Sequence, residues 1–399
     1  MAEQHEKALV PQIRFTGFTD PWEQRKLGEL FEEHSEKDRD DLPALTIIQG
    51  GGTVHRDESN RNLQFDRNSL SNYKVVDTGD FIVHLRSFEG GLEKATCCGL
   101  VSPAYHIFRG KNVDSDFYYL YFRSKRFIDA DLKPHVYGIR DGRSIDIEGM
   151  KTIFIPWTNL AEQRRIGAFF DRLDSLITLH QRKYDKLCVL KKSMLDKMFP
   201  KGGSLYPEIR FAGFTDPWEQ RKLGELYQKN DERNTDGLGS ERTLSVASMT
   251  FNSAGNGADD SSLPNYKRLR LGDIAFEGHT NKEFAYGRFV LNDAGNGIMS
   301  PRFTCLRPIV EQEYSFWKYF IHSEKVMRPI LVNSTKSGTM MNELVVEDFL
   351  KQEILVPSLP EQRRIGAFFD RLDSLITLHQ RKLELLRNIK KSMLDKMFV

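Results

Sequence analysis

Cysteine is scarce in this sequence: the chain has four cysteines in 399 residues, and no two of them form a Cys-x-x-Cys pair. Structural zinc sites are usually built from such spaced pairs, so we expect reduced thiols and no metal site. Long apolar runs are missing as well, because no segment approaches the ~20 residues that a membrane-spanning helix needs. The N-terminus also lacks the apolar core of a signal peptide. These absences predict a cytoplasmic protein that makes no contact with a membrane.

Motifs for catalysis are equally scarce. No Glu-x-Lys, His-Glu-x-x-His or Gly-x-Ser-x-Gly motif occurs, and the Gly-x-Gly fragments lack the third glycine of a dinucleotide-binding loop. Asp-Pro-Trp at residues 20–22 and 216–218 lacks the second proline of the Asp-Pro-Pro-aromatic site of adenine methyltransferases. A proline-fixed turn with an anchoring tryptophan is therefore the favoured interpretation. We predict a protein without catalytic residues.

Charge is modest, with a formal net charge of +2, and an excess of basic residues is confined to two stretches, 159–200 and 358–399. The regions before and between these stretches are slightly acidic. A nucleic-acid-binding domain is usually strongly basic. Any contact with DNA must then come from local basic loops or from partner proteins.

An exact internal repeat is the most informative feature that the sequence does contain. Three segments each occur twice: residues 162–183 and 361–382, residues 191–199 and 390–398, and residues 17–30 and 213–226. A repeat of this kind indicates one structural plan built twice. The predicted boundaries are 1–158 for a first domain, 159–200 for a first helix, 201–357 for a second domain and 358–399 for a second helix.

Both basic stretches predict a long helix. Apolar residues recur every seven positions from Ile166 and from Ile365, and Ser358 with Glu361 forms a capping box before the second helix. Because a long helix on a small domain would leave its apolar stripe exposed, we predict an antiparallel coiled coil within the chain, with a pseudo-twofold axis. The alternative is that each helix packs only on its own domain. The residues assigned to the coiled-coil seam, or to a surface for partner proteins, are Ile166, Phe169, Leu173, Leu176, His180, Leu187, Ile365, Phe368, Leu372, Leu375, His379 and Leu386.

The regions between the repeats, 31–157 and 227–357, differ from each other but share sparse landmarks in one order: Asn-Tyr-Lys, then Gly-Asp, then Ser-Pro. β-Branched and alternating runs after each Gly-Asp predict strands, and aromatic-rich helices are expected at 117–126 and 314–325. Each region is therefore predicted to be an α+β domain. One scaffold with different loops suits a pair of readers for two different targets.

Polar loops after the Gly-Asp strand and before each long helix are the candidate ligand-binding segments. Arginine reads guanine by two hydrogen bonds, asparagine reads adenine, and threonine or backbone amides hold phosphates. The alternative interpretation is a solvated polar loop without a ligand. The candidate DNA-binding residues are Arg86, Ser87, Glu89, Arg140, Arg143, Ser144, His279, Asn281, Lys282, Lys336 and Thr339.

The repeated plan resembles the specificity subunit of type I restriction-modification systems, in which two target-recognition domains alternate with two near-identical helical spacers. The residues that carry the resemblance are the Gly-Phe-Thr-Asp-Pro-Trp-Glu segments, the Leu-x-Glu-Gln-Arg-Arg-Ile helix starts at Leu160 and Leu359, and the Gly-Asp and Ser-Pro landmarks. Together they span essentially the whole chain. Strict repetition fails at the junctions before the long helices, because Trp157-Thr158-Asn159-Leu160-Ala161 stands where the second copy has Ser358-Leu359-Pro360.

The resemblance implies a non-catalytic subunit that binds a split sequence in double-stranded DNA, one half per domain. It also implies two modification subunits, which methylate adenine, and ATP-dependent restriction subunits as partners. S-adenosylmethionine, ATP and Mg²⁺ are then expected on those partners, and no cofactor is expected on this chain. Two other functions remain open from the residues alone: a DNA adenine methyltransferase with degenerate motifs, and an assembly scaffold that does not bind DNA.

Overall fold

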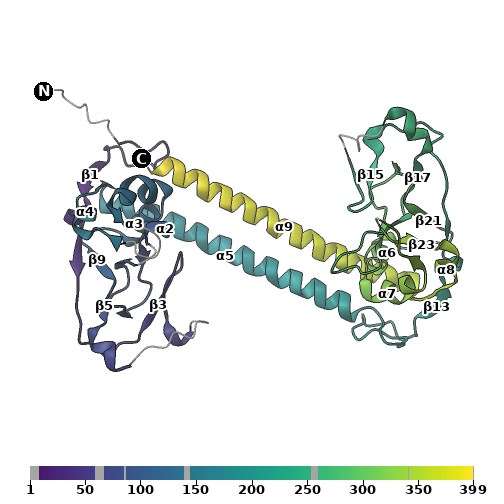
Figure 1. The fold of residues 1–399 in the computed structure, drawn as a ribbon, viewed down its shortest axis with the longest axis horizontal. Coiled ribbons are helices and arrows are strands. Elements are labelled where there is room, and N and C mark those ends of the chain that lie inside the picture. The colour runs from purple at the N-terminus through teal and green to yellow at the C-terminus, as the bar shows by residue number, and fades with distance from the viewer. Residues whose placement is uncertain are drawn as a thin grey trace. The chain divides into compact units, whose positions relative to one another are not determined.

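A computed structural model of the chain describes residues 9–58, 67–84, 87–138, 144–252, 259–339 and 341–398. Contacts divide the chain into two compact units: Met1–His180 with Lys382–Val399 is the first unit, and Gln181–Arg381 is the second unit. Each unit contains part of both long helices, α5 (Leu160–Lys197) and α9 (Leu359–Met397) (Figure 1). The boundaries predicted from the sequence, by contrast, keep each long helix whole.

The first unit is built on a four-stranded antiparallel sheet in the order β2-β9-β6-β7. These strands are β2 (Phe31–His34), β9 (His106–Gly110), β6 (Phe81–Val83) and β7 (Glu93–Lys94). The two-stranded pairs are β1 (Glu23–Lys26) with β12 (Phe154–Trp157), β3 (Leu45–Ile48) with β4 (Gly52–His55), β5 (Lys74–Val76) with β8 (Gly99–Val101), and β10 (Val136–Tyr137) with β11 (Ser144–Ile145). The shorter α-helices are α1 (Leu27–Leu30), α2 (Ser87–Gly90), α3 (Ser115–Phe122) and α4 (Ile147–Lys151). They are accompanied by the 3-10 helices η1 (Arg56–Glu58), η2 (Arg67–Asn72) and η4 (Lys133–His135) and by the short π-helix η3 (Phe127–Leu132).

The second unit repeats this plan with a four-stranded antiparallel sheet in the order β14-β21-β18-β19. These strands are β14 (Tyr227–Lys229), β21 (Thr304–Pro308), β18 (Ile274–Glu277) and β19 (Arg288–Leu291). The two-stranded pairs are β13 (Glu219–Lys222) with β24 (Glu353–Val356), β15 (Leu244–Ser245) with β16 (Thr250–Phe251), β17 (Lys267–Leu269) with β20 (Gly297–Met299), and β22 (Thr335–Lys336) with β23 (Glu343–Leu344). The shorter helices are α6 (Tyr314–Phe320), α7 (Glu324–Val332) and α8 (Val346–Lys351), with the turns η6 (Leu223–Glu225), η7 (Ser240–Arg242) and η8 (Asp260–Asn265). Equal strand order in both units confirms the predicted α+β fold built twice.

The aromatic helices are shorter than predicted. The first ends at Phe122, and the second is divided into α6 and α7, because the chain leaves the helix at Ile321 and a new helix begins after Ser323. Their aromatic side chains fill the cores, where Phe117 and Phe316 are 0% exposed. No helix in the described ranges has both the length and the apolar composition needed to cross a membrane.

The Gly-Asp landmark marks the same buried ion pair in both units. Asp80 accepts hydrogen bonds from Nε and Nη2 of Arg109 at 2.9 and 2.8 Å, and Asp273 accepts from Nε and Nη2 of Arg307 at 3.0 and 2.9 Å. Each aspartate also accepts the backbone N–H of the residue three positions earlier. A buried carboxylate is tolerated only when paired and hydrogen-bonded in this way. The pair therefore joins the start of the Gly-Asp strand to the neighbouring strand of the sheet.

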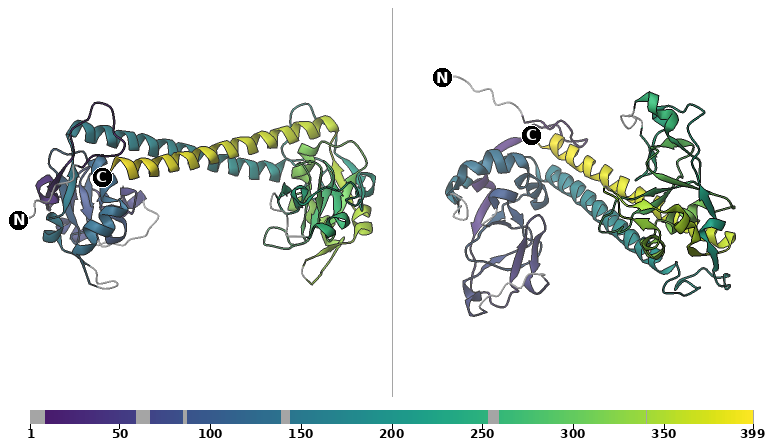
Figure 2. Two further views of the ribbon diagram at one scale, coloured as in Figure 1. Left: turned by 90° about the horizontal axis from the view of Figure 1, so that it is seen from above. Right: turned by 45° about the vertical axis from the view of Figure 1, so that its right-hand side comes forward.

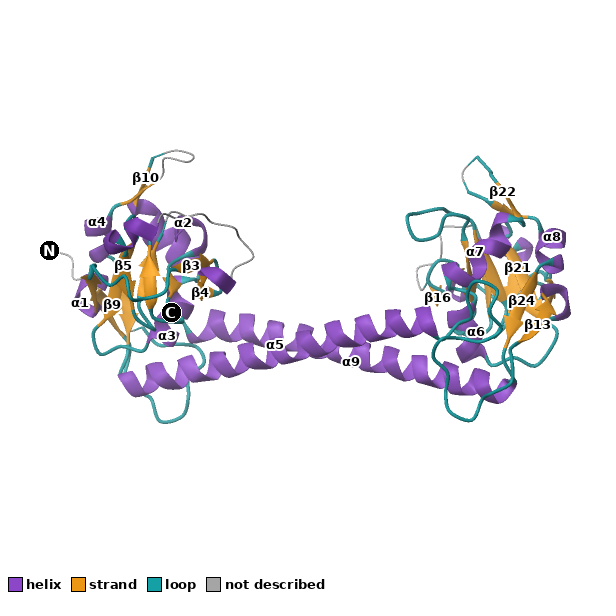
Figure 3. Ribbon diagram, turned by 90° about the horizontal axis from the view of Figure 1, so that it is seen from below, coloured by secondary structure: helices purple, strands orange, loops and turns teal. Residues whose placement is uncertain are grey.

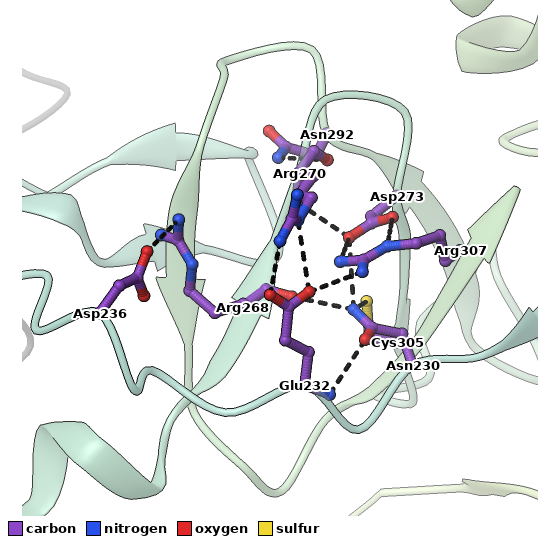
Figure 4. Close-up of polar contacts among 9 residues, drawn as sticks. All are labelled: Asn230, Glu232, Asp236, Arg268, Arg270, Asp273, Asn292, Cys305 and Arg307. Atoms are coloured by element: carbon purple, nitrogen blue, oxygen red, sulfur yellow. Dashed lines mark hydrogen bonds and ion pairs between the residues drawn. The ribbon is translucent and has the colours of Figure 1, made fainter.

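In the second unit this ion pair belongs to a larger network (Figure 4). Glu232 accepts from Arg270 at 2.7 Å and from Arg307 at 2.6 Å, and these two guanidinium groups lower the pKa of Glu232 to about 2. Burial raises the pKa of the Cys305 thiol to about 12, and Asn230 donates to its sulfur at 3.4 Å. The arginines and carboxylates of this network are paired with one another, so we interpret the network as structural.

The long helices run antiparallel where they meet in the first unit (Figures 2 and 3). Ile166 and Phe170, near the start of α5, are buried in a core that also contacts Met393, near the end of α9. Lys390 Nζ lies 2.6 Å from Asp174 Oδ1 across the pair. The start of one helix therefore packs against the end of the other.

The second unit repeats the arrangement with the roles of the helices exchanged. Ile365 and Phe369, near the start of α9, are buried in a core that contacts Met194 of α5, and Lys191 Nζ lies 2.6 Å from Asp373 Oδ1. The predicted antiparallel pairing is confirmed. Because the same residues also belong to the domain cores, each helix packs on its own domain as well.

Four of the residues assigned to the seam or to a partner surface lie outside the buried stripe of the helix pair. Leu176 and Leu375 are 37% and 36% exposed, and Phe169 and Phe368 pack edge-on against phenylalanine rings of the N-terminal part of their units, at a centroid distance of 5.7 Å in both cases. A pair of helices buries only a narrow stripe of side chains. Here that stripe contains the heptad residue and the residue four positions after it, whereas the residue three positions after it lies at the edge of the stripe. Of the other assigned residues, Ile166, Leu173, Ile365 and Leu372 are buried, and His180, Leu187, His379 and Leu386 are half-buried.

A buried glutamate at the start of each long helix binds the segment that opens each unit. Glu162 accepts from Nε and Nη2 of Arg14 at 2.6 and 2.8 Å and from Trp22 Nε1 at 3.1 Å. In the second unit, Glu361 binds Arg210 at 2.7 Å through both nitrogens and Trp218 Nε1 at 3.3 Å. The tryptophan of Asp-Pro-Trp is thus an anchor, as the sequence predicts.

A glycine in each long helix allows the aromatic helix to approach it closely. A Cβ atom built on Gly366 would lie 2.7 Å from the backbone nitrogen of Phe316, and one on Gly167 would lie 2.7 Å from Asp114 Oδ1. Real Cβ atoms essentially never lie within 3.0 Å of another heavy atom of this kind. The glycine of the repeated Arg-Ile-Gly-Ala motif is therefore required by packing.

Gly366→Ala should destabilise the second unit although alanine is the better helix former. Helix propensity alone would stabilise the variant by about 1 kcal/mol, whereas overpacking against the α6 backbone costs about 1–3 kcal/mol. Urea unfolding would measure the sign. Ala367→Gly, at the exposed neighbouring position, is the control for propensity, and a more stable Gly366→Ala protein would contradict the packing argument.

Candidate nucleic-acid interface

The predicted loops of the second unit lie next to each other. The hairpin β22–β23 contacts the segment after β18, because the backbone N–H of Asn342 donates to the carbonyl of Gly278 at 2.9 Å. Within each unit the hairpin, β10–β11 or β22–β23, projects on the side away from the long helices (Figure 3). Lys336 and Thr339 of the hairpin are exposed, as are His279, Asn281 and Lys282 of the other loop. Five predicted residues are therefore exposed on two loops that this hydrogen bond joins.

Two of these five side chains are engaged by their own loop. Asn281 Oδ1 accepts the backbone N–H groups of Glu283 and Phe284 at 2.8 and 2.9 Å. The His279 ring is paired with Glu277, whose Oε1 also accepts the His279 backbone N–H at 3.0 Å. A bidentate adenine contact needs both the oxygen and the nitrogen of asparagine. Asn281 therefore retains only its amide N–H groups for a ligand.

The first unit supplies fewer of its predicted residues. Ser87 is a correction: it is 0% exposed, and its hydroxyl accepts the backbone N–H of His84 at 2.9 Å. The serine stabilises the turn that begins α2, which is why it is buried and cannot meet a base edge. Glu89 and Ser144 are exposed. Arg86, Arg140 and Arg143 lie outside the described residues.

Arg288 is a neighbour of this surface that the sequence interpretation did not include. It lies in β19, 3.5 Å from Glu277 Oε2, with its guanidinium carbon 5.2 Å from the centre of the Phe284 ring. The sequence search considered loops, and Arg288 lies within a strand. Its position beside the surface became apparent only from its pairing with Glu277. Within the described ranges, no group of three or more His, Cys, Asp or Glu is placed to hold a metal ion.

Comparisons with known proteins agree with this geometry. Residues 215–388 match the family model of the type I restriction modification DNA specificity domain. The fold is similar to the crystal structure of the type I restriction-modification system S subunit from M. genitalium, with a TM-score of 0.50, 15% identity, and coverage of 98% of this chain and 99% of that chain. No curated protein matches the sequence.

Two further solved structures show lower similarity. The HsdS subunit from Thermoanaerobacter tengcongensis has a TM-score of 0.46 and 19% identity, with coverage of 94% of this chain and 96% of that chain. A structure described as the basis of complex assembly and conformational transition of the type I R-M system has a TM-score of 0.44 and 17% identity, with coverage of 94% and 97%.

The family match lies in the second copy of the repeat. The first copy has the same opening segment, the same helix start and the same strand order. DNA specificity, and not catalysis, is what the family contributes to a restriction-modification system, so a degenerate methyltransferase is not favoured. Residues 215–388 of the chain therefore match a type I restriction modification DNA specificity domain, and the first unit repeats the opening segment, the helix start and the strand order of that region.

Proposed function

We propose that the chain reads a bipartite, asymmetric target in double-stranded DNA, with one unit for each half-site. The observation that carries this proposal is one sheet framework, held by the same Asp–Arg pair, with different loops on it in the two units. The segment after β6 forms helix α2 around Ser87, whereas the segment after β18 is an open loop held by Asn281. Unlike loops on a shared framework present different donors and acceptors, so the half-sites differ in sequence.

Exposed leucines on the long helices support equivalent partner sites in the two units. Leu176 and Leu179 are 37% and 46% exposed, and the matching Leu375 and Leu378 are 36% and 45% exposed. These pairs lie within the identical segments 162–183 and 361–382. An apolar patch repeated in identical sequence suits two copies of one partner. We assign these surfaces to two modification subunits.

The remaining components of the proposal follow from the match of residues 215–388 to the specificity domain. Restriction subunits complete the complex, and S-adenosylmethionine, ATP and Mg²⁺ belong to the partner subunits. The chain works in the cytoplasm, where its DNA is accessible. The net charge of only +2 fits a subunit whose DNA contacts come from local loops and whose affinity is shared with partners.

Replacing residues 31–157 by a copy of 227–357 tests the assignment of one half-site to each unit. Both units would then carry the same loops, so the target should become a nearly symmetric inverted repeat. Mapping of methylated adenines in DNA exposed to the complex with its modification subunits would measure the target. Recovery of the original asymmetric sequence would refute the proposal.

Leu179→Glu together with Leu378→Glu tests the helix surfaces. A carboxylate facing an apolar partner surface must be desolvated, so assembly with the modification subunits should weaken about tenfold or more. Isothermal titration calorimetry would measure the affinity. Thr178→Glu with Thr377→Glu, at exposed neighbouring positions in both helices, is the charge-matched control. Equal losses in both double variants would argue against a specific apolar site.

Asn281→Asp separates a base contact from loop stability. Aspartate keeps the oxygen that holds the loop but removes the amide donors, so discrimination at one base pair of the second half-site should fall by about 1 kcal/mol. Competition binding with single-base-pair variants would measure this. Asn333→Asp, an exposed position in the same unit, is the control for added charge. A uniform loss at all base pairs would indicate a phosphate contact, and unchanged discrimination would leave Asn281 as a loop residue only.

For the first half-site, Arg143→Ala tests the arginine predicted from sequence to read guanine. Loss of a bidentate contact should cost about 1–3 kcal/mol of discrimination at one base pair of that half-site. The same competition assay would measure it, and the second half-site should keep its full discrimination. A change in both half-sites would contradict the assignment of one half-site to each unit.

A further inference from the structure

The second unit contains a cavity of about 810 Å³ that is lined by none of the predicted DNA-binding residues. Its wall is formed by the last turns of α5, the loop between β15 and β16, strand β19, the end of α6 and the start of α7, all within Gln181–Arg381. Much of the wall is apolar: Val189, Leu195, Ala247, Met249, Val290 and Leu291. A cavity of this size and lining can hold the body of a small organic molecule.

Most of the positive charge in the wall is already neutralised. Lys191 and Lys318 each bind an aspartate at 2.6 Å, and Lys325 is paired with Asp196. The fourth lysine of the wall, Lys192, has an exposed side chain. An anionic ligand would therefore have to compete with carboxylates that already hold these lysines.

Hydrogen-bond acceptors are available where α7 begins. Glu324 Oε1 accepts the Ala285 backbone N–H at 3.4 Å, while Oε2 is buried without a hydrogen-bond partner among the described residues. His322 Nδ1 lies 3.2 Å from the carbonyl of Phe289, so Nδ1 donates and Nε2 is the acceptor nitrogen. Burial raises the pKa of Glu324 and lowers the pKa of His322. Glu283 adds a second carboxylate to this part of the wall.

The first unit has a guanidinium group at the corresponding place. Glu93 of β7 and Val290 of β19 occupy equivalent positions in the two sheets. Glu93 pairs with Ile82, and Val290 pairs with Ala275, and each of these partners is the second residue of the strand that follows Gly-Asp. Arg123 and His322 also occupy equivalent positions. Phe117 and Phe316 pack edge-on against the anchoring tryptophans, and Arg123 and His322 each lie six residues after that phenylalanine. Arg123 is ion-paired with Glu93, which is 0% exposed, and lies 5.6 Å from the centre of the Tyr119 ring.

We propose that the cavity of the second unit binds an organic cation, with its ammonium or guanidinium group held by Glu324 and His322 and its apolar body against β19. The first unit supplies this cation from its own Arg123. The second unit has His322 and Val290 at the positions of Arg123 and Glu93, and Oε2 of Glu324 has no hydrogen-bond partner among the described residues. The ligand is either a free alkylamine or alkylguanidine, or a lysine or arginine side chain of a partner subunit, which present the same chemistry.

Titration of the full-length protein with agmatine, a free alkylguanidine, tests the first source without DNA or partners. Loss of a charged hydrogen bond costs about 1.5–3 kcal/mol, so Glu324→Gln should weaken binding about tenfold or more. Glu347→Gln makes the same chemical change at an exposed position of α8 in the same unit and should bind agmatine normally. Equal affinity of the two variants for agmatine would overturn a site at Glu324.

His322→Arg provides a second variant, which restores the arginine that the first unit has at this position. The new guanidinium should occupy the site of the ligand head and abolish agmatine binding while the protein remains folded, as thermal unfolding would verify. Undiminished agmatine binding by His322→Arg would also overturn the proposal.

A lack of agmatine binding by the wild-type chain would leave the partner side chain as the source. In that case Glu324→Gln and His322→Arg should each weaken assembly with the modification subunits about tenfold, and Glu347→Gln should not. If agmatine does not bind and assembly is the same in all three variants, the proposal is wrong. Because the agmatine titration contains no DNA, its result is independent of whether the chain recognises a bipartite target.

Discussion

A buried carboxylate at the start of each long helix is the interaction on which the rest of the structure depends. Glu162 and Glu361 are 0% and 1% exposed, and a charge so far from water is stable only with a full set of partners. An arginine and a tryptophan of the opening segment supply those partners in both units. The glutamine after each glutamate bonds to the start of the aromatic helix. The side chain of Gln163 accepts the backbone N–H of Asp114 at 2.9 Å, and that of Gln362 accepts the backbone N–H of Glu313 at 3.3 Å. One dipeptide thus ties together the opening strand, the long helix and the aromatic helix, which explains why these segments recur together in the chain.

The two units have the same sheet framework around these glutamates but differ in the residues at their surfaces. The Asp–Arg pair of the central strands is retained with nearly equal distances, whereas the edge strand carries Glu93 in one unit and Val290 in the other. The same contrast separates the buried Ser87 turn from the Asn281 loop. The charged groups of the framework are hydrogen-bonded to one another and do not need the loops as partners. The framework therefore tolerates such replacements in the loops and at the edge strand. Two different readers can therefore be built on one fold, and a cavity can open in one copy where an internal ion pair fills the other.

The long helices combine three tasks in one sequence. Their first turns carry the glutamate node, their buried stripe joins the core of the domain to the end of the other helix, and their outer face leaves Leu179 and Leu378 exposed. Each task uses a different face or a different stretch of the helix. Gly167 and Gly366 show how tightly these tasks are fitted, since a single methyl group would meet the aromatic helix. Exact repetition of residues 162–183 is the expected result when every face of a helix is in use.

The sequence by itself determined the repeated architecture, the two long helices and their antiparallel pairing, because exact repeats and heptad spacing are local or periodic signals. It also identified the Gly-Asp landmark without revealing its partner, since Arg109 and Arg307 lie about thirty residues further along the chain. Only the tertiary structure decided which face of each helix is buried, moving Leu176 and Leu375 out of the seam, and which loop residues are already engaged, as with Ser87 and Asn281. The cavity beside His322 and Glu324 likewise depends on five separate segments meeting. Burial and hydrogen-bond saturation are sums over neighbours distant in sequence, and no local pattern contains those neighbours.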